Sequence, residues 1–339
     1  MILKRGGKMA NKKPYARLGS IAFWKAYWIT MRPYLLFVSA VAGMAGFADG
    51  PQTEIGVTAL AFIVFFLSYG FSQGVTDSFQ MDTDAISSPY RPLIQGIINR
   101  AQVLPVSLVG LFAGCAVLFI LNPKTIFLGL PAVLGLITYT YFKRRWWAGP
   151  FYNAWIVAFL PIIGKMVSSG RESSPSSVFQ EGMLLAVVLS VFFSYANFVL
   201  MGYYKDISAD RKSGYNTFLV VFGWQKGAVV CDIFAGLSLL ASGWGIFGVI
   251  LAEKVFSFRW VSLVVFAGAA ALFVLAQVRI HKIRDEELAF KPIANVVRGF
   301  ILLHLAEIFC LRPEWIPAGV LFYISFEWIL KRRPAKEQV

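Results

Sequence analysis

Two short stretches of the chain concentrate five of its 18 acidic residues, and these are the residues best suited to chemistry. The first stretch carries Asp77, Asp82 and Asp84, and the second carries Asp206 and Asp210. In a helix with about 100° per residue, Asp206 and Asp210 differ by about 40° and therefore share a face. Asp77 and Asp84 differ by about 20°, whereas Asp82 points about 140° away and belongs to another surface.

Basic side chains stand beside these acids, namely Arg91, Lys205, Arg211 and Lys212. Like charges at helical spacing repel each other, and this repulsion is more costly at the mouth of an apolar bundle unless a cation lies between them. Acids alone would indicate a Ca²⁺ site or a proton path. Acids interleaved with Arg and Lys indicate polyphosphate bridged by Mg²⁺, which binds one or two carboxylates together with phosphate oxygens. Ordinary solvated loop charges are the alternative, but they do not explain the matched faces.

The elements that position these acids are long apolar runs. The chain is 58% hydrophobic and only 15% charged, with a mean hydropathy of +0.65, which argues against a soluble enzyme. Its 31 Phe, 13 Tyr and 10 Trp exclude a disordered chain. Candidate spans lie at 29–47, 55–76, 104–121, 126–142, 151–168, 182–203, 228–251, 261–278, 297–311 and 316–330, of which the last two are short for the ~20 residues that a span needs. We therefore predict an all-α, polytopic transmembrane helical bundle of nine or ten helices.

The distribution of Lys and Arg gives the orientation of this bundle. With the N-terminus in the cytoplasm, all but six of the 32 basic residues fall in cytoplasmic segments. The six on the other side are Lys124, Lys165, Arg171, Lys254, Arg259 and Arg312. Four spans separate the two acidic stretches, so both should lie at the cytoplasmic face. The net charge of +14 then indicates loops facing anionic lipid, and no nucleic acid is expected as a partner.

The chain is expected to form a single domain of a multi-pass cell-membrane protein. Residues 21–330 form the transmembrane unit, and residues 1–20 and 331–339 form basic cytoplasmic tails. The three cysteines are scattered singly, and there are only two histidines, so neither a disulfide framework nor a histidine metal cage is expected.

The two acidic stretches resemble the sequence motifs of one family of membrane enzymes. Residues 84–92 read DAISSPYRP, and residues 203–214 read YYKDISADRKSG. Together with Asp77 they are similar to the two Asp-rich motifs of the UbiA superfamily of intramembrane prenyltransferases. The motifs follow the second and sixth spans, as they do in that family, and the resemblance covers about residues 25–310. The family pattern is also matched by Arg32-Pro33 at the start of the first span and by Lys143-Arg144 at the end of the fourth.

Two features depart from the family pattern. Its first motif reads Asn-Asp-x-x-Asp-x-x-x-Asp, and here Thr76 and Gln80 replace the Asn and the middle Asp. Both replacements keep an oxygen ligand but carry no charge, so we expect the second motif to bind metal–diphosphate more tightly. The family has nine spans, whereas residues 316–330 predict a tenth.

The resemblance implies a Mg²⁺-dependent enzyme that moves a prenyl group from a prenyl diphosphate to a small aromatic or lipid-alcohol acceptor. It implies that metal binding and catalysis depend on Asp77, Asp84, Asp206 and Asp210. Substrate-binding residues would be Arg32, Thr76, Gln80, Arg91, Lys143, Asn153, Tyr203 and Lys205. The site would open to the cytoplasm, and the prenyl tail would lie in the bundle interior and open to lipid. Loss of diphosphate leaves an allylic cation, which a dry pocket protects and aromatic rings stabilise; the candidate rings are Tyr195, Phe198 and Tyr203.

Other polar residues within the spans have two interpretations. Asn153 and Asn197 either line the acceptor pocket or form ordinary hydrogen bonds between helices. Asp232, His304, Glu307 and Glu327 are ionisable groups in apolar runs, but none matches a family motif, so they are left out of the site.

Two other functions compete with prenyl transfer. The altered first motif is compatible with a terpene cyclase on the same scaffold. The ionisable residues within the spans are compatible with a transporter or with a non-catalytic membrane partner. The acceptor, the length of the prenyl chain and the oligomeric state are not specified by these motifs.

Overall fold

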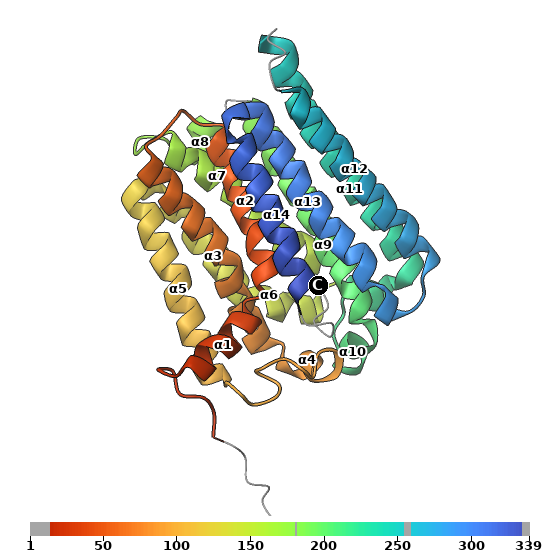
Figure 1. Cartoon of the computed structure of the whole chain (residues 1–339). Helices are drawn as coiled ribbons and strands as arrows, with labels where there is room; N and C mark the ends of the chain where they lie inside the picture. Colours follow the sequence, from red (N-terminus) through yellow and green to blue (C-terminus); the bar gives the residue numbers. More distant parts are fainter. Residues whose placement is uncertain (1–13, 180–181, 254–258, 334–339) are drawn as a thin grey trace, which may run out of the picture.

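The computed structural model describes residues 14–179, 182–253 and 259–333, and within them the secondary structure is helical (Figure 1). The long helices are α2 (Leu36–Ala48), α3 (Ile55–Phe79), α5 (Arg100–Leu121), α6 (Ile126–Arg145), α7 (Gly149–Ser168), α9 (Gly182–Gly202), α11 (Phe218–Glu253), α12 (Trp260–Lys282), α13 (Phe290–Leu311) and α14 (Ile316–Arg332). Shorter elements are α1 (Ile21–Thr30), α4 (Met81–Ser87), α8 (Pro175–Val178) and α10 (Ile207–Lys212). The predicted basic tails fall largely outside the described residues.

The number of membrane-spanning helices agrees with the sequence. Eight helices in the described part of the chain are long and apolar enough to cross a bilayer, and there are nine if α1 and α2 are counted as one bent span. The predicted all-α transmembrane bundle is therefore confirmed, and the protein is a multi-pass membrane protein.

The first span is broken where the sequence predicts a continuous helix over 29–47. The segments Ile21–Thr30 and Pro33–Ala48 meet at an angle of 49°. Arg32 lies at the break with φ 51° and ψ 73°, a left-handed conformation that non-glycine residues rarely adopt. A residue before proline is disfavoured in the right-handed helical region, so Pro33 explains why the helix stops here. The break turns a basic residue toward the bundle interior.

The centre of the bundle is formed by α2, α7, α9 and α13, and every residue of α2 is buried. Small residues bring the backbones of α2 and α7 into direct contact. A Cβ atom at Gly46 would overlap the carbonyl of Pro161, and one at Gly164 would overlap the carbonyl of Gly43. Close approach through small residues is the usual way in which helices associate in a membrane, and here it fixes two walls of the site.

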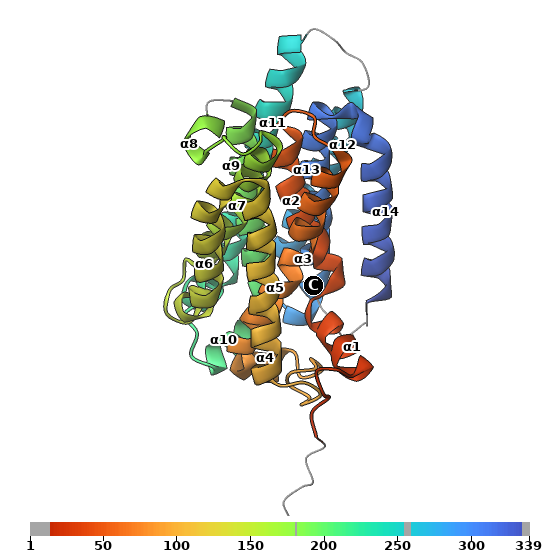
Figure 2. The ribbon, with the colours of Figure 1, turned by 90° about the vertical axis from the view of Figure 1, so that its left-hand side faces the viewer.

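The tenth predicted span, residues 316–330, lies in α14, which runs along the outside of the bundle (Figure 2). Its 17 residues fall somewhat short of the ~20 needed to cross the hydrocarbon core. Phe322 and Phe326 of α14 lie 4.8 and 5.6 Å from the Phe37 ring of α2, measured between ring centroids. The additional helix thus packs against α2 through these aromatic rings.

The two acidic stretches lie at the same end of the bundle, as predicted. The short helices α4, which carries Asp82 and Asp84, and α10, which carries Asp210, pack against each other there (Figure 1). Asp77 lies in the last turn of α3, which ends at Phe79, and Asp206 directly precedes α10. A backbone break at Gln80 separates Asp77 from Asp84, so these two acids do not share one continuous helix. Asp206 and Asp210 do lie one helical turn apart, since the Asp210 N–H donates to the Asp206 carbonyl at 2.7 Å.

Candidate active site

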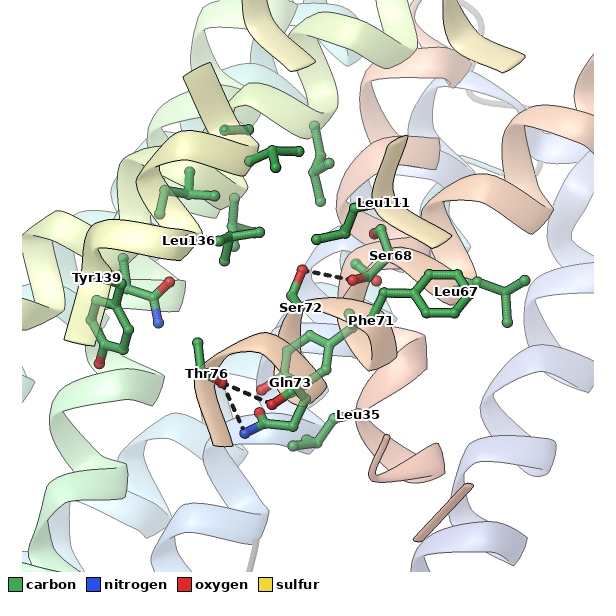
Figure 3. A pocket seen from close by; sticks show the side chains of 18 of the residues that line it. Leu35, Leu67, Ser68, Phe71, Ser72, Gln73, Thr76, Leu111, Leu136 and Tyr139 are labelled. Atoms are coloured by element: carbon green, nitrogen blue, oxygen red, sulfur yellow. Dashed lines mark hydrogen bonds between the residues drawn. The ribbon is translucent and has the colours of Figure 1, made fainter. Parts of the chain in front are cut away.

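A cavity of about 440 Å³ extends from the α4–α10 end into the bundle. Its walls come from α2, α3, α5, α6, α7 and α9. Figure 3 shows polar Gln73 and Thr76 at its lower end and apolar Leu111 and Leu136 above them. Ser68 and Ser72 also line the wall, but their hydroxyls donate to backbone carbonyls of α3, so they leave that wall largely apolar. The cavity is therefore a long apolar chamber with one polar end.

The first acidic stretch forms an ion-paired cluster at this polar end. Arg32 Nη2 lies 3.0 Å from Asp77 Oδ1, and Arg91 Nη1 lies 3.5 Å from the same oxygen. Arg91 also pairs with Asp84. Gln73 Nε2 donates to Asp77 Oδ1 at 2.5 Å. Burial raises the pKa of Asp84 above its ordinary value, although Arg91 opposes that shift. Without a metal ion, the two arginines compensate the two carboxylates.

The second acidic stretch is less fully paired. Asp206 lines the cavity, and its Oδ1 is buried without a hydrogen-bond partner. Asp210 lies behind the cavity wall, completely buried, with Oδ1 accepting from Thr83 at 3.2 Å and lying 3.8 Å from Lys143 Nζ. Its other oxygen, Oδ2, has no partner. Burial raises the pKa of Asp210 to about 6, with Lys143 opposing the shift.

Lys143 connects the two stretches. Its Nζ donates to Gln80 Oε1 at 3.0 Å and lies 5.1 Å above the ring of Tyr203. The hydroxyls of Tyr203 and Tyr139 are 2.8 Å apart. Lys143 is 5% exposed, so its charge acts in a low-dielectric environment between the stretches. Gln80, the neutral residue at a position that is acidic in the family, thus serves as an acceptor for this ammonium group.

The donor set fits a hard cation only in combination with a ligand. Among the described residues, no three His, Cys, Asp or Glu side chains lie close enough together to hold a metal by themselves. Asp206, which lines the cavity, nevertheless keeps a buried carboxylate oxygen without a hydrogen-bond partner, and such an oxygen is stabilised by a cation. Mg²⁺ commonly uses one or two carboxylates and completes its shell with phosphate oxygens and water, so these residues fit Mg²⁺ brought in with a diphosphate.

The structure brings together all but one of the predicted site residues. Those that line the cavity are Arg32, Thr76, Asp77, Gln80, Asp84, Arg91, Lys143, Asn153, Tyr203, Lys205 and Asp206. Asp210 is the exception, because it contacts Lys143 and Thr83 from behind the wall. Two of the candidate rings, Tyr195 and Phe198, also line the cavity, 5.6 Å apart and edge to face.

Besides Ser39, Ser68 and Ser72, three larger polar residues of the cavity were not predicted from the sequence, namely Tyr69, Gln73 and Tyr139. Gln73 precedes Asp77 by four residues, and Tyr139 precedes Lys143 by four. Residues at this spacing are neighbours on a helix surface, so a search one turn upstream of each charged residue would have found both.

The remaining polar residues within the spans have partners elsewhere. Asn197 accepts a hydrogen bond from Gln277 of α12 at 3.2 Å and does not line the cavity, which matches the interhelical interpretation. The four ionisable residues form pairs away from the cavity: Asp232–His281, His304–Glu307 and Arg298–Glu327.

Comparison with known proteins identifies relatives with this architecture. The model of the UbiA prenyltransferase family matches residues 36–304. Digeranylgeranylglyceryl phosphate synthase of Pyrococcus abyssi is 26% identical over 225 residues, which cover 64% of this chain and 76% of that protein. Chloroplastic chlorophyll synthase of Arabidopsis thaliana is 26% identical over 219 residues, covering 56% of this chain and 53% of that protein.

Solved structures share the fold at lower sequence identity. A UbiA homolog from Aeropyrum pernix superposes with a TM-score of 0.64 at 18% identity, over 85% of this chain and 97% of that one. A UbiA homolog from Archaeoglobus fulgidus, bound to DMAPP and Mg²⁺, superposes with a TM-score of 0.60 at 17% identity. The match covers 83% of this chain and 98% of that one.

Proposed function

The chain belongs to the UbiA prenyltransferase family, and on that basis we propose that it transfers a prenyl group from a prenyl diphosphate to a small aromatic or lipid-alcohol acceptor. The observation that carries this proposal is the long apolar cavity whose polar end holds Asp77, Asp84 and Asp206 beside Arg32 and Arg91. Such a cavity suits a molecule with a hydrocarbon tail and a highly charged head.

The polar end provides the groups that a leaving diphosphate needs. Breaking the allylic C–O bond places negative charge on the diphosphate, and preorganised cations lower the barrier most when they lie in a water-poor site. Arg32, Arg91, Lys143 and Lys205 all line this end of the cavity. Mg²⁺, when bound through the carboxylates, would neutralise further charge on the phosphate oxygens. In the relative from A. fulgidus, DMAPP and Mg²⁺ are bound together.

The length of the cavity suits a prenyl diphosphate. Gly129 and Lys143 both line it and are fourteen residues apart on α6, which corresponds to about 21 Å at 1.5 Å per residue. Since Lys143 lies at the polar end, this length accommodates the diphosphate together with a hydrocarbon chain of several isoprene units. We therefore propose a donor of the size of geranylgeranyl diphosphate.

The allylic cation would form next to aromatic rings. Tyr195, Phe198 and Tyr203 all line the cavity. Each ring face can stabilise a desolvated cation by about 2 kcal/mol, and the apolar walls exclude the water that would capture it. The acceptor would enter the same chamber, where Asn153 offers a hydrogen bond.

The proposal is tested with purified full-length protein, Mg²⁺ and radiolabelled prenyl diphosphates of 10, 15 and 20 carbons. We expect a prenylated product only when an acceptor is present, with the 20-carbon donor used most efficiently. Acceptors should include a glycerol phosphate ether lipid and a small phenol, which represent the two proposed classes. A cyclic hydrocarbon formed without acceptor would instead identify a terpene cyclase. That alternative is favoured by Gln80, which replaces the middle Asp of the first motif. Diphosphate release that never exceeds background would favour a transporter or non-catalytic partner.

We propose further that the polar end of the cavity faces the cytoplasm, as the distribution of basic residues indicates. Lys212 on α10 and Arg171 after α7 are both exposed and belong to opposite ends of the bundle. In a background without native cysteines, Lys212→Cys should react with an impermeant thiol reagent only from the cytoplasmic side. Arg171→Cys, the matched control, should react only from outside. The reverse pattern would invert the topology.

A further inference from the structure

Asp82 is the acid of the first stretch that does not face the cavity, and it has two partners of its own. Its Oδ1 accepts a hydrogen bond from Arg144 Nη2 at 2.8 Å and another from the Tyr215 hydroxyl at 2.9 Å. Neither Asp82 nor these two partners line the cavity. The three residues, which we call the clasp, therefore do not contact the cavity contents directly.

The clasp joins three separate segments at the mouth of the site. Asp82 lies on α4, Arg144 is in the last turn of α6, and Tyr215 follows α10. Arg144 also donates to the carbonyl of Phe79 at 3.1 Å, at the end of α3, and its guanidinium lies 4.8 Å from the centre of the Tyr215 ring. The Arg144 carbonyl in turn accepts from the backbone N–H of Asn216 at 2.9 Å.

Each member of the clasp is connected to a charged residue of the site, either as a near neighbour in sequence or through a backbone hydrogen bond. Asp82 is two residues before Asp84, and Arg144 directly follows Lys143. The backbone N–H of Tyr215 donates to the carbonyl of Asp210 at 2.8 Å. A shift of the clasp would therefore move carboxylates of both stretches together with the lysine between them.

Burial distinguishes this arrangement from an ordinary surface ion pair. The side chains of Asp82 and Arg144 are 42% and 37% exposed, and a pair at such exposure normally contributes little. Tyr215, however, is only 1% exposed, so its hydroxyl needs an acceptor and Asp82 supplies one. The buried hydroxyl thus fixes the carboxylate in one orientation.

We propose that Asp82, Arg144 and Tyr215 are positioning residues that hold Asp84 of the first stretch and Asp206 of the second at the separation needed to bind a divalent cation with diphosphate. This inference rests on the proposed function, because it concerns the same site. Loss of groups that orient metal ligands typically weakens metal binding by about 10- to 100-fold. The clasp should therefore affect metal affinity more than turnover at saturating metal.

The experiment measures binding of Mn²⁺, which is visible by electron paramagnetic resonance, to the full-length protein with geranylgeranyl thiodiphosphate, an unreactive donor analogue. Tyr215→Phe removes one hydroxyl without changing the ring, and Asp82→Ala removes the shared acceptor. Both should raise the Kd for Mn²⁺ about tenfold. The double variant should bind no more weakly than Asp82→Ala, because that change already removes the hydrogen bond from Tyr215. Asp82→Glu should restore part of the affinity.

Arg145→Gln provides the matched control, since Arg145 lies on the same helix end but stacks on Tyr141 and does not contact Asp82 or Tyr215. It should leave the Kd within twofold of the unmodified protein. If Tyr215→Phe and Asp82→Ala also stay within twofold, the clasp has no positioning role and the inference is overturned. If the unmodified protein binds no Mn²⁺ with the analogue, it is the proposed function that fails.

Discussion

Removal of divalent cations should reduce prenyl transfer to background, at least about 10³-fold, and Mg²⁺ should restore it. The reason is the charge that a diphosphate brings to the polar end of the cavity, where four cationic side chains already face four carboxylates. Asp206 and Asp210 each keep a buried oxygen without a partner, and a diphosphate adds further negative charge beside them. The measurement is the rate of product formation after exhaustive EDTA treatment and after graded addition of MgCl₂.

EDTA already saturated with Mg²⁺ serves as the control and should leave the rate unchanged. Chelation should not unfold the protein, because Arg32 and Arg91 already compensate Asp77 and Asp84 without metal. The thermal unfolding transition should therefore persist in EDTA. Undiminished turnover after chelation would mean that the arginines and lysines alone neutralise the diphosphate, and the metal-bridged site would have to be abandoned.

The positions of most spans could be predicted because a membrane imposes a simple rule on sequence. Long apolar runs and the placement of Lys and Arg are local properties, so α9, for example, was expected at 182–203 and ends at Gly202. Backbone breaks are harder to predict, because they depend on a few residues. The sequence places Pro33 at the start of the first span, but Pro33 restricts the backbone conformation of Arg32 and thereby separates α1 from α2.

The site could be predicted as a set of residue types but not as a set of contacts. Matched spacing placed Asp77 and Asp84 together, and the structure agrees that both line the cavity. The same reasoning placed Asp210 beside Asp206, and the two do lie one helical turn apart, yet only Asp206 lines the cavity, because Asp210 is directed toward Thr83 and Lys143. Contacts such as that of Lys143 with Gln80 join residues far apart in sequence, and no local pattern reports them.

The two carboxylates of the second stretch should be more important for catalysis than the neutral residue of the first. Asp206→Asn and Asp210→Asn should each lower kcat/KM by about 10²-fold, the scale of losing one preorganised charged group. Asp206→Asn removes a charge that faces the cavity. Asp210→Asn removes the carboxylate that holds Lys143 in place from 3.8 Å, so a displaced lysine should lower kcat even though the loss of one negative charge does not oppose diphosphate binding. Steady-state kinetics with the 20-carbon donor give both values.

Gln80→Ala should cost only about tenfold, because a hydrogen bond to a charged group contributes about 1.5 kcal/mol and Lys143 keeps its contact with Asp210. Asp285→Asn is the matched control for Asp206→Asn and Asp210→Asn, because it also replaces an acid at this end of the bundle by its amide. Asp285 is exposed and accepts only from the backbone of nearby Glu287, so its replacement should leave kcat/KM within twofold. If Gln80→Ala proved as damaging as Asp210→Asn, the amide would have a specific catalytic or acceptor-binding role. The first stretch would then not be a weakened metal site but a site rebuilt around the Gln80–Lys143 hydrogen bond.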